Sequence, residues 1–213
     1  MDNCQLLHQL FNSLKIFSFP FDEDEIPLNG IYILFENGER AHDINRIVRI
    51  GTHTGNNQLR SRLKQHFINE NKDRSIFRKN IGRCILNKES DPLLRQWELD
   101  LTSKTLREKY AKSINYDRQK EMERKVSEYV QNNFSFSVFR VDDKEKRLSL
   151  ESKIASTISL CNKCAPSPNW LGLYSPKEKI VKSGLWQVNE LYKMPLSDNE
   201  ITELRRIIEL KNH

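Results

Sequence analysis

Asn29 to Phe67 reads NGIYILFENGERAHDINRIVRIGTHTGNNQLRSRLKQHF, and this stretch decides the fold of the chain. Successive side chains of a β-strand point to opposite faces, so the alternating pattern of 30–35 predicts a strand with one apolar face. That apolar face carries Ile31, Ile33 and Phe35. Tyr32 therefore points to the opposite side of the predicted strand.

A second short strand is predicted at 47–51. Val48 and Ile50 are expected to share its apolar face, which turns Arg49 to the other side. If the two strands pair antiparallel with their apolar faces matched, Arg49 and Tyr32 lie on the same surface of the sheet.

Polar segments come before and after the second strand. Asn37-Gly38 is a turn signal, but the eight residues of 37–44 are too many for a two-residue hairpin loop. Residues 51–57 are rich in glycine and amide side chains, which predicts a loop that leads into a helix.

The helix that follows this loop has a buried stripe formed by Leu59, Leu63 and Phe67. Arg62 and His66 border this stripe, where packing can hold a side chain in a fixed geometry. Arg60 and Lys64 lie further out and are candidate contacts to substrate phosphates.

These residues carry a resemblance to a known family. Gly30-Ile31-Tyr32, then Arg49-Ile50-Gly51, then Arg62 and His66 resemble the signature of the GIY-YIG nuclease superfamily. That superfamily includes homing endonucleases, excision-repair incision subunits and some restriction enzymes. The resemblance implies an α+β fold with a small three-stranded antiparallel sheet flanked by helices. Arg49 departs from the pattern, because the family usually has a second tyrosine at that position.

The composition fits a globular protein that binds a polyanion. The chain has 213 residues, of which 37% are hydrophobic and 30% charged, and its formal net charge is +6. Residues 39–83 hold eleven Lys and Arg against four Asp and Glu. This basic block favours nucleic acid as the partner over a merely solvated surface. The sequence has no apolar run that could cross a membrane and no signal-peptide pattern, so we expect a cytoplasmic protein without a membrane partner.

The pattern along the chain predicts three parts. Residues 1–28 form an N-terminal helix, which Pro20 ends, and an acidic connector. Residues 29–172 form the nuclease-like domain, with a helical insertion at about 88–133 and a third strand at 134–141. Residues 173–213 form a C-terminal extension that ends in an amphipathic helix.

Further candidate residues lie beyond the first helix of this domain. Arg78 and Lys79 lie on a predicted helix at about 75–86, where they are phosphate contacts or simply its solvated face. Glu151 interrupts the apolar stripe of the helix after the third strand, which is costly without a cation partner. The resemblance implies that Glu151 binds the metal; the alternative is an ion pair with an arginine such as Arg62. Asn169 matches an asparagine that the family carries beyond this helix, although it is also a turn former.

The resemblance also implies a division of chemical roles. Tyr32 takes or relays a proton from the attacking water, Glu151 holds a single Mg²⁺ or Mn²⁺, and Arg62 binds the non-bridging phosphate oxygens. Arg49 cannot act as a base and would instead stabilise negative charge on the tyrosine oxygen. His53 is a further candidate proton partner, as is His66, and the alternative for both histidines is a structural hydrogen-bonding role.

The sequence therefore predicts a metal-dependent endonuclease that cuts DNA to leave 5′-phosphate and 3′-hydroxyl ends, in restriction or another defence against foreign DNA. A catalytically inactive nucleic-acid-binding protein and an RNA nuclease are the alternatives. An enzyme that cuts a palindrome would be expected to form a homodimer.

Four cysteines are present, and two of them have the spacing of zinc ligands. Cys161 and Cys164 form a Cys-x-x-Cys pair, but no second pair follows to complete a four-ligand site. The sequence thus favours reduced thiols over a metal site there.

Overall fold

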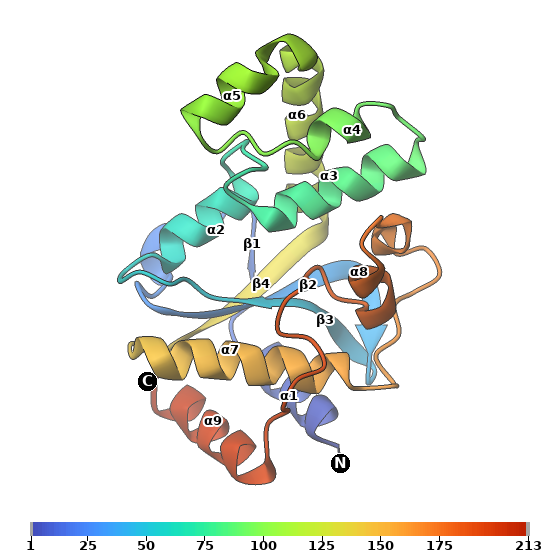
Figure 1. The fold of residues 1–213 in the computed structure, drawn as a ribbon. Helices are drawn as coiled ribbons and strands as arrows, with labels where there is room; N and C mark the ends of the chain where they lie inside the picture. The colour runs from blue at the N-terminus through green and yellow to red at the C-terminus, as the bar shows by residue number, and fades with distance from the viewer. Residues whose placement is uncertain (1, 212–213) are drawn as a thin grey trace.

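The computed structural model describes residues 2–211 and is a mixed α+β protein built on one antiparallel sheet (Figure 1). The strands are β1 (Phe17–Ser18), β2 (Gly30–Ala41), β3 (Ile44–Gly51) and β4 (Phe134–Arg140), in the spatial order β1-β4-β2-β3. This arrangement confirms the predicted fold class. The short strand β1 was not expected, and it extends the three predicted strands to four by pairing with β4.

The hairpin between β2 and β3 turns later than the sequence indicated. Its loop is the two-residue turn His42-Asp43, in which both residues have positive φ (51° and 65°), as a type I′ turn requires. The Asn37-Gly38 pair lies inside β2, where Gly38 has φ 83° within an irregularity of the ladder. The turn signal therefore marks a bulge, and the hairpin extends beyond it to His42.

A second bulge corrects the predicted faces of β3. Leu34 pairs with Arg49 while Phe35 pairs with Ile47, so Val48 is an extra residue in the ladder. As a result, Val48 packs on the same side as Leu34, and Ile50 packs on the opposite side. Arg49 keeps the predicted side and shares it with Tyr32.

Three helices cover one face of the sheet. They are α1 (Asn3–Asn12), α7 (Lys144–Ser159) and α9 (Asp198–Lys211), which lie below the sheet in Figure 1. The core on this side includes Phe11, Ile33, Ile50, Ile154 and Leu204. Helix α1 ends at Asn12 with Ser13 as its C-cap, before Pro20, because the chain then extends to form β1.

The opposite face is covered by α2 (Leu59–Phe67), α3 (Ile76–Lys88) and α6 (Tyr116–Asn133). Between α3 and α6 the chain forms α4 (Leu94–Trp97), α5 (Lys104–Tyr110) and the 3-10 helix η2 (Ala111–Ser113). The remaining short helices are η1 (Glu23–Glu25), η3 (Leu171–Tyr174) and α8 (Glu178–Ser183). Within residues 2–211, none of the helices is both long enough and apolar enough to span a membrane.

A segment near the C-terminus covers the outer edge of the sheet at β3. The Trp186 N–H donates to Val48 O at 2.7 Å, and Gln187 Oε1 accepts the Ile50 N–H at 3.0 Å. The Trp186 indole also donates to the buried carboxylate of Glu36 at 2.7 Å. Because an edge strand otherwise exposes unpaired backbone groups, this segment protects β3 and fixes its position.

Candidate active site

Tyr32 and His66 are joined in a buried hydrogen-bonded chain. Tyr32 Oη lies 2.8 Å from His66 Nε2, and His66 Nδ1 lies 2.7 Å from Ser75 Oγ. All three residues are fully buried. Strand β2 supplies the tyrosine, α2 supplies the histidine, and Ser75 is the N-cap of α3, so two helices and the sheet set this geometry.

Ser75 and Tyr32 contact opposite nitrogens of the His66 ring. Ser75 Oγ also accepts the Arg78 N–H at 3.2 Å. A neutral imidazole donates from one nitrogen and accepts at the other, so it joins the two hydroxyl groups in a single hydrogen-bonded chain. Burial, reinforced by Arg62, Arg49 and Arg78, holds the pKa of His66 well below its ordinary value, which keeps the ring neutral as this pattern requires.

Arg49 also contacts the oxygen of Tyr32. Its Nε donates to that oxygen at 3.4 Å, and its Nη1 donates to Trp186 O. The guanidinium carbon also lies 5.6 Å from the centre of the Phe77 ring. Within residues 2–211, Arg49 is in no salt bridge, and its charge acts on the nearby His66 and Glu151.

Arg62 lines a cleft of about 340 Å³ beside the hydrogen-bonded residues Tyr32 and His66. Its Nη1 donates to Gln65 Oε1 at 3.0 Å and to Arg74 O at 3.1 Å. Thr52 and His53 line the same cleft. In the part of the chain that the structure describes, Arg62 is bound to no carboxylate, so its guanidinium has donors to offer an anion in the cleft.

Glu151 on α7 reaches the end of β3. Its carboxylate accepts the backbone N–H of Thr52, the residue that follows β3. Burial raises the pKa of Glu151, Arg49 and Arg62 oppose that rise by Coulombic attraction, and Glu190 adds to it. No direct ion pair involves Glu151 among residues 2–211, so the alternative in which Arg62 neutralises it by contact is not formed. The structure thus brings Tyr32 and Glu151 into one site. The same site contains two cations, Arg49 and Arg62, and the neutral imidazole of His66.

His53 has a structural place beside this site. Its Nδ1–H donates to Gly55 O at 2.7 Å, and its Nε2 accepts the Gly30 N–H at 3.4 Å. Burial lowers the pKa of His53, so both nitrogens serve these contacts in the neutral ring. Arg147 lies behind the loop, fully buried, and donates to the carbonyls of His53 and Gly55.

Arg78 and Lys79 are not surface phosphate contacts. Arg78 is fully buried and donates to Glu123, to His66 O and to Ser127. Lys79 is also buried, and its Nζ lies 3.3 Å from Asp73 Oδ1. The correction follows from two tertiary contacts of α3. Helix α6 covers Arg78, and the chain at Glu98 and Leu99 covers Lys79 by accepting from its ammonium group.

Arg60 and Lys64 are on the surface but hold acidic partners. Arg60 Nη1 lies 2.8 Å from Asp24 Oδ1, and Lys64 Nζ lies 3.0 Å from Glu23 Oε2. The acidic connector therefore covers the outer side of α2. Asn169 is exposed in the turn before η3, where its neighbour Trp170 contacts Glu36 rather than the tyrosine site.

Sequence reasoning missed four residues of this site. Ser75 had a helix N-cap signal, yet its contact with His66 depends on how α2 and α3 pack. Thr52, Arg147 and Glu190 act through tertiary contacts with Glu151 or the 53–55 loop. Sequence spacing contains no signal for such contacts.

The fold is that of a small α+β protein in which a tyrosine, two arginines and a glutamate from separate elements meet near the end of strand β3. A family model described as a GIY-YIG domain matches residues 5–212, and the chain therefore belongs to the GIY-YIG family. Proteins of this family are nucleases, and membership supports a nuclease function for the chain. A search of curated proteins and a search of solved structures found no match.

Proposed function

We propose that this protein is a metal-dependent endonuclease that hydrolyses phosphodiester bonds in DNA and leaves 5′-phosphate and 3′-hydroxyl ends. The observation that carries the proposal is the contact of Tyr32 Oη with His66 Nε2 and with the Arg49 N–H, beside the carboxylate of Glu151, which forms no ion pair among residues 2–211. These groups match the needs of phosphodiester hydrolysis, which are proton removal from water, neutralisation of phosphate charge and help for the leaving oxygen.

Glu151 fits a divalent metal ion. Mg²⁺ and Mn²⁺ prefer oxygen ligands, and one or two protein carboxylates are enough because the substrate phosphate and water complete the coordination. Glu151 is a partly buried carboxylate without a direct ion pair among the described residues, and burial raises its pKa. A cation at its oxygens would remove that cost. When bound, the ion would act as a Lewis acid on the phosphate and its leaving oxygen.

Tyr32 would act on the attacking water as a phenolate, after its own proton has passed to solvent. The Arg49 N–H on Oη would stabilise that negative charge, and the phenolate would then accept a proton from the water. Arg49 therefore supports a one-tyrosine mechanism in place of the second tyrosine of the family. Arg62 would hold the non-bridging oxygens with its planar guanidinium, since it lines the cleft and binds no carboxylate of the described residues 2–211.

DNA as the substrate is supported by the family and by the positive charge of Arg49 and Arg62, which form no ion pair among the described residues. A role in restriction or other defence, a homodimer and a cytoplasmic location extend this proposal. An inactive nucleic-acid-binding protein is the competing function, and the assembled contacts of Tyr32 with His66 and Arg49 favour the enzyme.

The test is cleavage of plasmid and phage DNA by the wild-type protein and by Glu151→Gln, with Mg²⁺, with Mn²⁺ and with EDTA. Metal-dependent cleavage that Glu151→Gln loses, with ends that DNA ligase can reseal, supports the proposal. A labelled RNA panel separates DNA from RNA cleavage. If the folded wild-type protein retards DNA in a gel and cuts neither substrate, the inactive binding protein is the correct assignment.

A further inference from the structure

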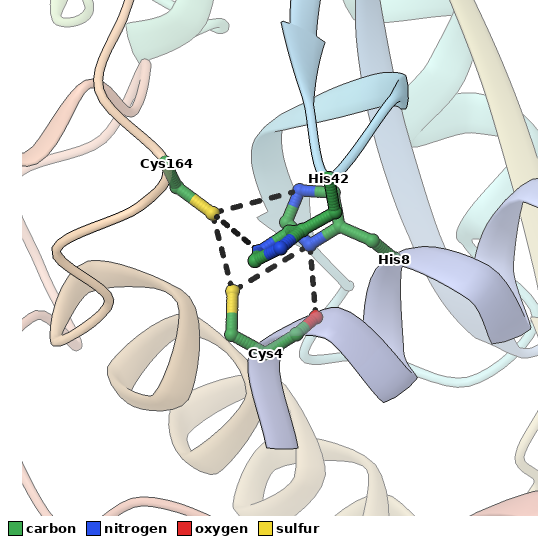
Figure 2. Close-up of side chains that lie close together, drawn as sticks. All are labelled: Cys4, His8, His42 and Cys164. Carbon is green, nitrogen blue, oxygen red and sulfur yellow. Dashed lines mark hydrogen bonds between the residues drawn. The ribbon is translucent and has the colours of Figure 1, made fainter. Parts of the chain in front are cut away.

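A cluster of sulfur and imidazole groups lies at the other end of the β2–β3 hairpin. Cys4 and His8 come from α1, His42 from the hairpin turn and Cys164 from the segment after α7, and Figure 2 shows their side chains pointing toward one another. One ligand atom from each of the four lies within 4.8 Å of the others. Three of these side chains are buried, and His42 is half-buried. None of them takes part in the tyrosine site.

The distances in this cluster match those between the ligands of one metal ion. Cys4 Sγ lies 3.3 Å from Cys164 Sγ, which is wider than the ~2.05 Å of a disulfide bond. His42 Nε2 lies 3.2 Å from Cys164 Sγ and 3.9 Å from Cys161 Sγ. Tetrahedral zinc with Zn–S near 2.3 Å and Zn–N near 2.0 Å places its ligand atoms roughly 3.3–3.8 Å apart.

His8 and Cys161 compete for the fourth position, and their other contacts distinguish them. His8 Nδ1–H donates to Cys4 O at 2.9 Å, and its Nε2 accepts the Ile47 N–H at 3.2 Å, so backbone groups occupy both nitrogens. Cys161 Sγ accepts the Lys163 N–H at 3.4 Å, a contact that stabilises a thiolate. With Cys4 and His42, Cys161 also belongs to a second set of donors within 4.8 Å of one another.

We propose that Cys4, His42, Cys161 and Cys164 bind a structural Zn²⁺ ion, with His8 as a positioning residue. The Cys-x-x-Cys pair lacked partners in the sequence, and the structure supplies them from positions more than a hundred residues earlier. Three thiolates and one imidazole form a set that zinc prefers and that Mg²⁺, which requires oxygen ligands, does not.

The proposed ion has a mechanical role in this fold. It joins the N-terminal helix, the tip of the hairpin and the chain just after α7, the helix that carries Glu151. Tyr32 lies nine residues before Ala41 in the same strand, which is roughly 30 Å from the hairpin turn in an extended chain. The zinc is therefore remote from the nuclease chemistry. Its role is to hold the N-terminal helix, the hairpin tip and the end of α7 together.

Metal content tests the proposal directly. The full chain, purified under reducing conditions without a polyhistidine tag, should contain close to one zinc per molecule by inductively coupled plasma mass spectrometry. Cys161→Ser and Cys164→Ser should each lose most of this zinc. His8→Asn should keep it, since the new side chain can still donate to Cys4 O. Cys84→Ser, which changes a buried thiol in the other core, is the matched control and should keep the full content.

A measurement on the wild-type protein covers the possibility that a ligand variant fails to fold. Zinc is removed and replaced by Co²⁺ under reducing conditions. Three thiolates in a tetrahedral site should give sulfur-to-cobalt charge-transfer bands in the near ultraviolet together with strong d–d bands in the red.

Three results would overturn the proposal. The first is wild-type protein that binds neither zinc nor cobalt in reducing buffer. The second is a disulfide between Cys4 and Cys164 in protein from reducing cells. The third is loss of the ion in His8→Asn with retention in Cys161→Ser, which would reverse the two assigned roles.

Discussion

His66 Nε2 lies 2.8 Å from Tyr32 Oη, and both side chains are fully buried. The histidine therefore does not face solvent as a free base. Its ring joins Ser75, the N-cap of α3, to the tyrosine oxygen through hydrogen bonds at both nitrogens. The ring stays neutral because burial and the nearby arginines lower the pKa of His66. His66 thus has a structural hydrogen-bonding place at the tyrosine oxygen.

Tyr32→Phe should abolish most of the cleavage while leaving the fold intact. The change removes Oη and keeps the ring that packs against His66. We expect a fall of about 10²–10⁴-fold in the single-turnover cleavage rate, the usual contribution of a general base. Thermal unfolding provides the control, and an unchanged cleavage rate in the folded variant would remove Tyr32 from the mechanism.

Arg49→Gln should slow cleavage by about 10²-fold. Glutamine keeps a donor near Tyr32 Oη but removes the positive charge, which is the property that we assign to this position. Because Arg49 also donates to Trp186 O, the rate should be compared at matched folded fractions measured by circular dichroism. Equal rates for the two proteins would show that the charge has no catalytic role.

The pKa of His66 predicts how stability depends on pH. Burial first, and then the nearby arginines, lowers the pKa of His66 in the folded state below its ordinary 6.5. Below about pH 6.5, His66 binds a proton in the unfolded chain but not in the folded chain. The free energy of unfolding therefore falls as the pH decreases below about 6.5. The slope from this group should approach ~1.4 kcal/mol per pH unit.

Urea unfolding of wild type and His66→Gln between pH 7.5 and 5 isolates this contribution. The carboxylates and His53 titrate in both proteins, so the difference between the two slopes belongs to His66. A wild-type slope no steeper than that of the variant would contradict the assignment of a neutral buried ring.

Arg147→Met should destabilise the protein by about 2–4 kcal/mol, because it removes the buried guanidinium that donates to the carbonyls of His53 and Val141. Arg140→Met is the matched control, since Arg140 is an exposed arginine whose change should cost less than about 0.5 kcal/mol. Chemical unfolding measures both. Similar losses for the two variants would mean that the contacts of Arg147 with the loop contribute little.

Neutralising two carboxylates of the acidic connector should strengthen binding to DNA. In Glu23→Gln/Asp24→Asn, Arg60 and Lys64 lose their ion pairs and become available to phosphates. The slope of log affinity against log salt should steepen by about one for each released cation. Fluorescence anisotropy across a salt series measures this slope. Glu25→Gln is the control because Glu25 pairs with Lys15 instead, and an equal effect would point to net charge rather than to α2.

The sequence was sufficient for the parts that depend on local pattern. Alternation placed Tyr32 and Arg49 on one surface, and the four-residue spacing placed Arg62 and His66 beside the buried stripe of α2. The family model then confirmed the resemblance that these residues carry. Periodicity predicts these positions because the direction of each of these side chains follows from the repeat of its own strand or helix.

The sequence was insufficient where the position of a residue depends on distant partners. Arg78 and Lys79 looked solvated because the segments that cover them lie later in the chain, in α6 for Arg78 and at residues 98–99 for Lys79. The turn at His42 was not predicted because the glycine of the Asn37-Gly38 turn signal lies in a bulge within β2 and not in the hairpin loop. The thiols of Cys161 and Cys164 looked unpartnered because their neighbours Cys4 and His42 lie in other elements.

The strand order β1-β4-β2-β3 has a consequence for synthesis of the chain on the ribosome. Strand β4 occupies the gap between β1 and β2, yet it begins about a hundred residues after β2. At ordinary translation rates, the β2–β3 hairpin waits roughly 5–20 seconds for that neighbour. During this interval one edge of β2 is open to wrong pairing, so nascent chains that stall before residue 134 should need chaperone protection.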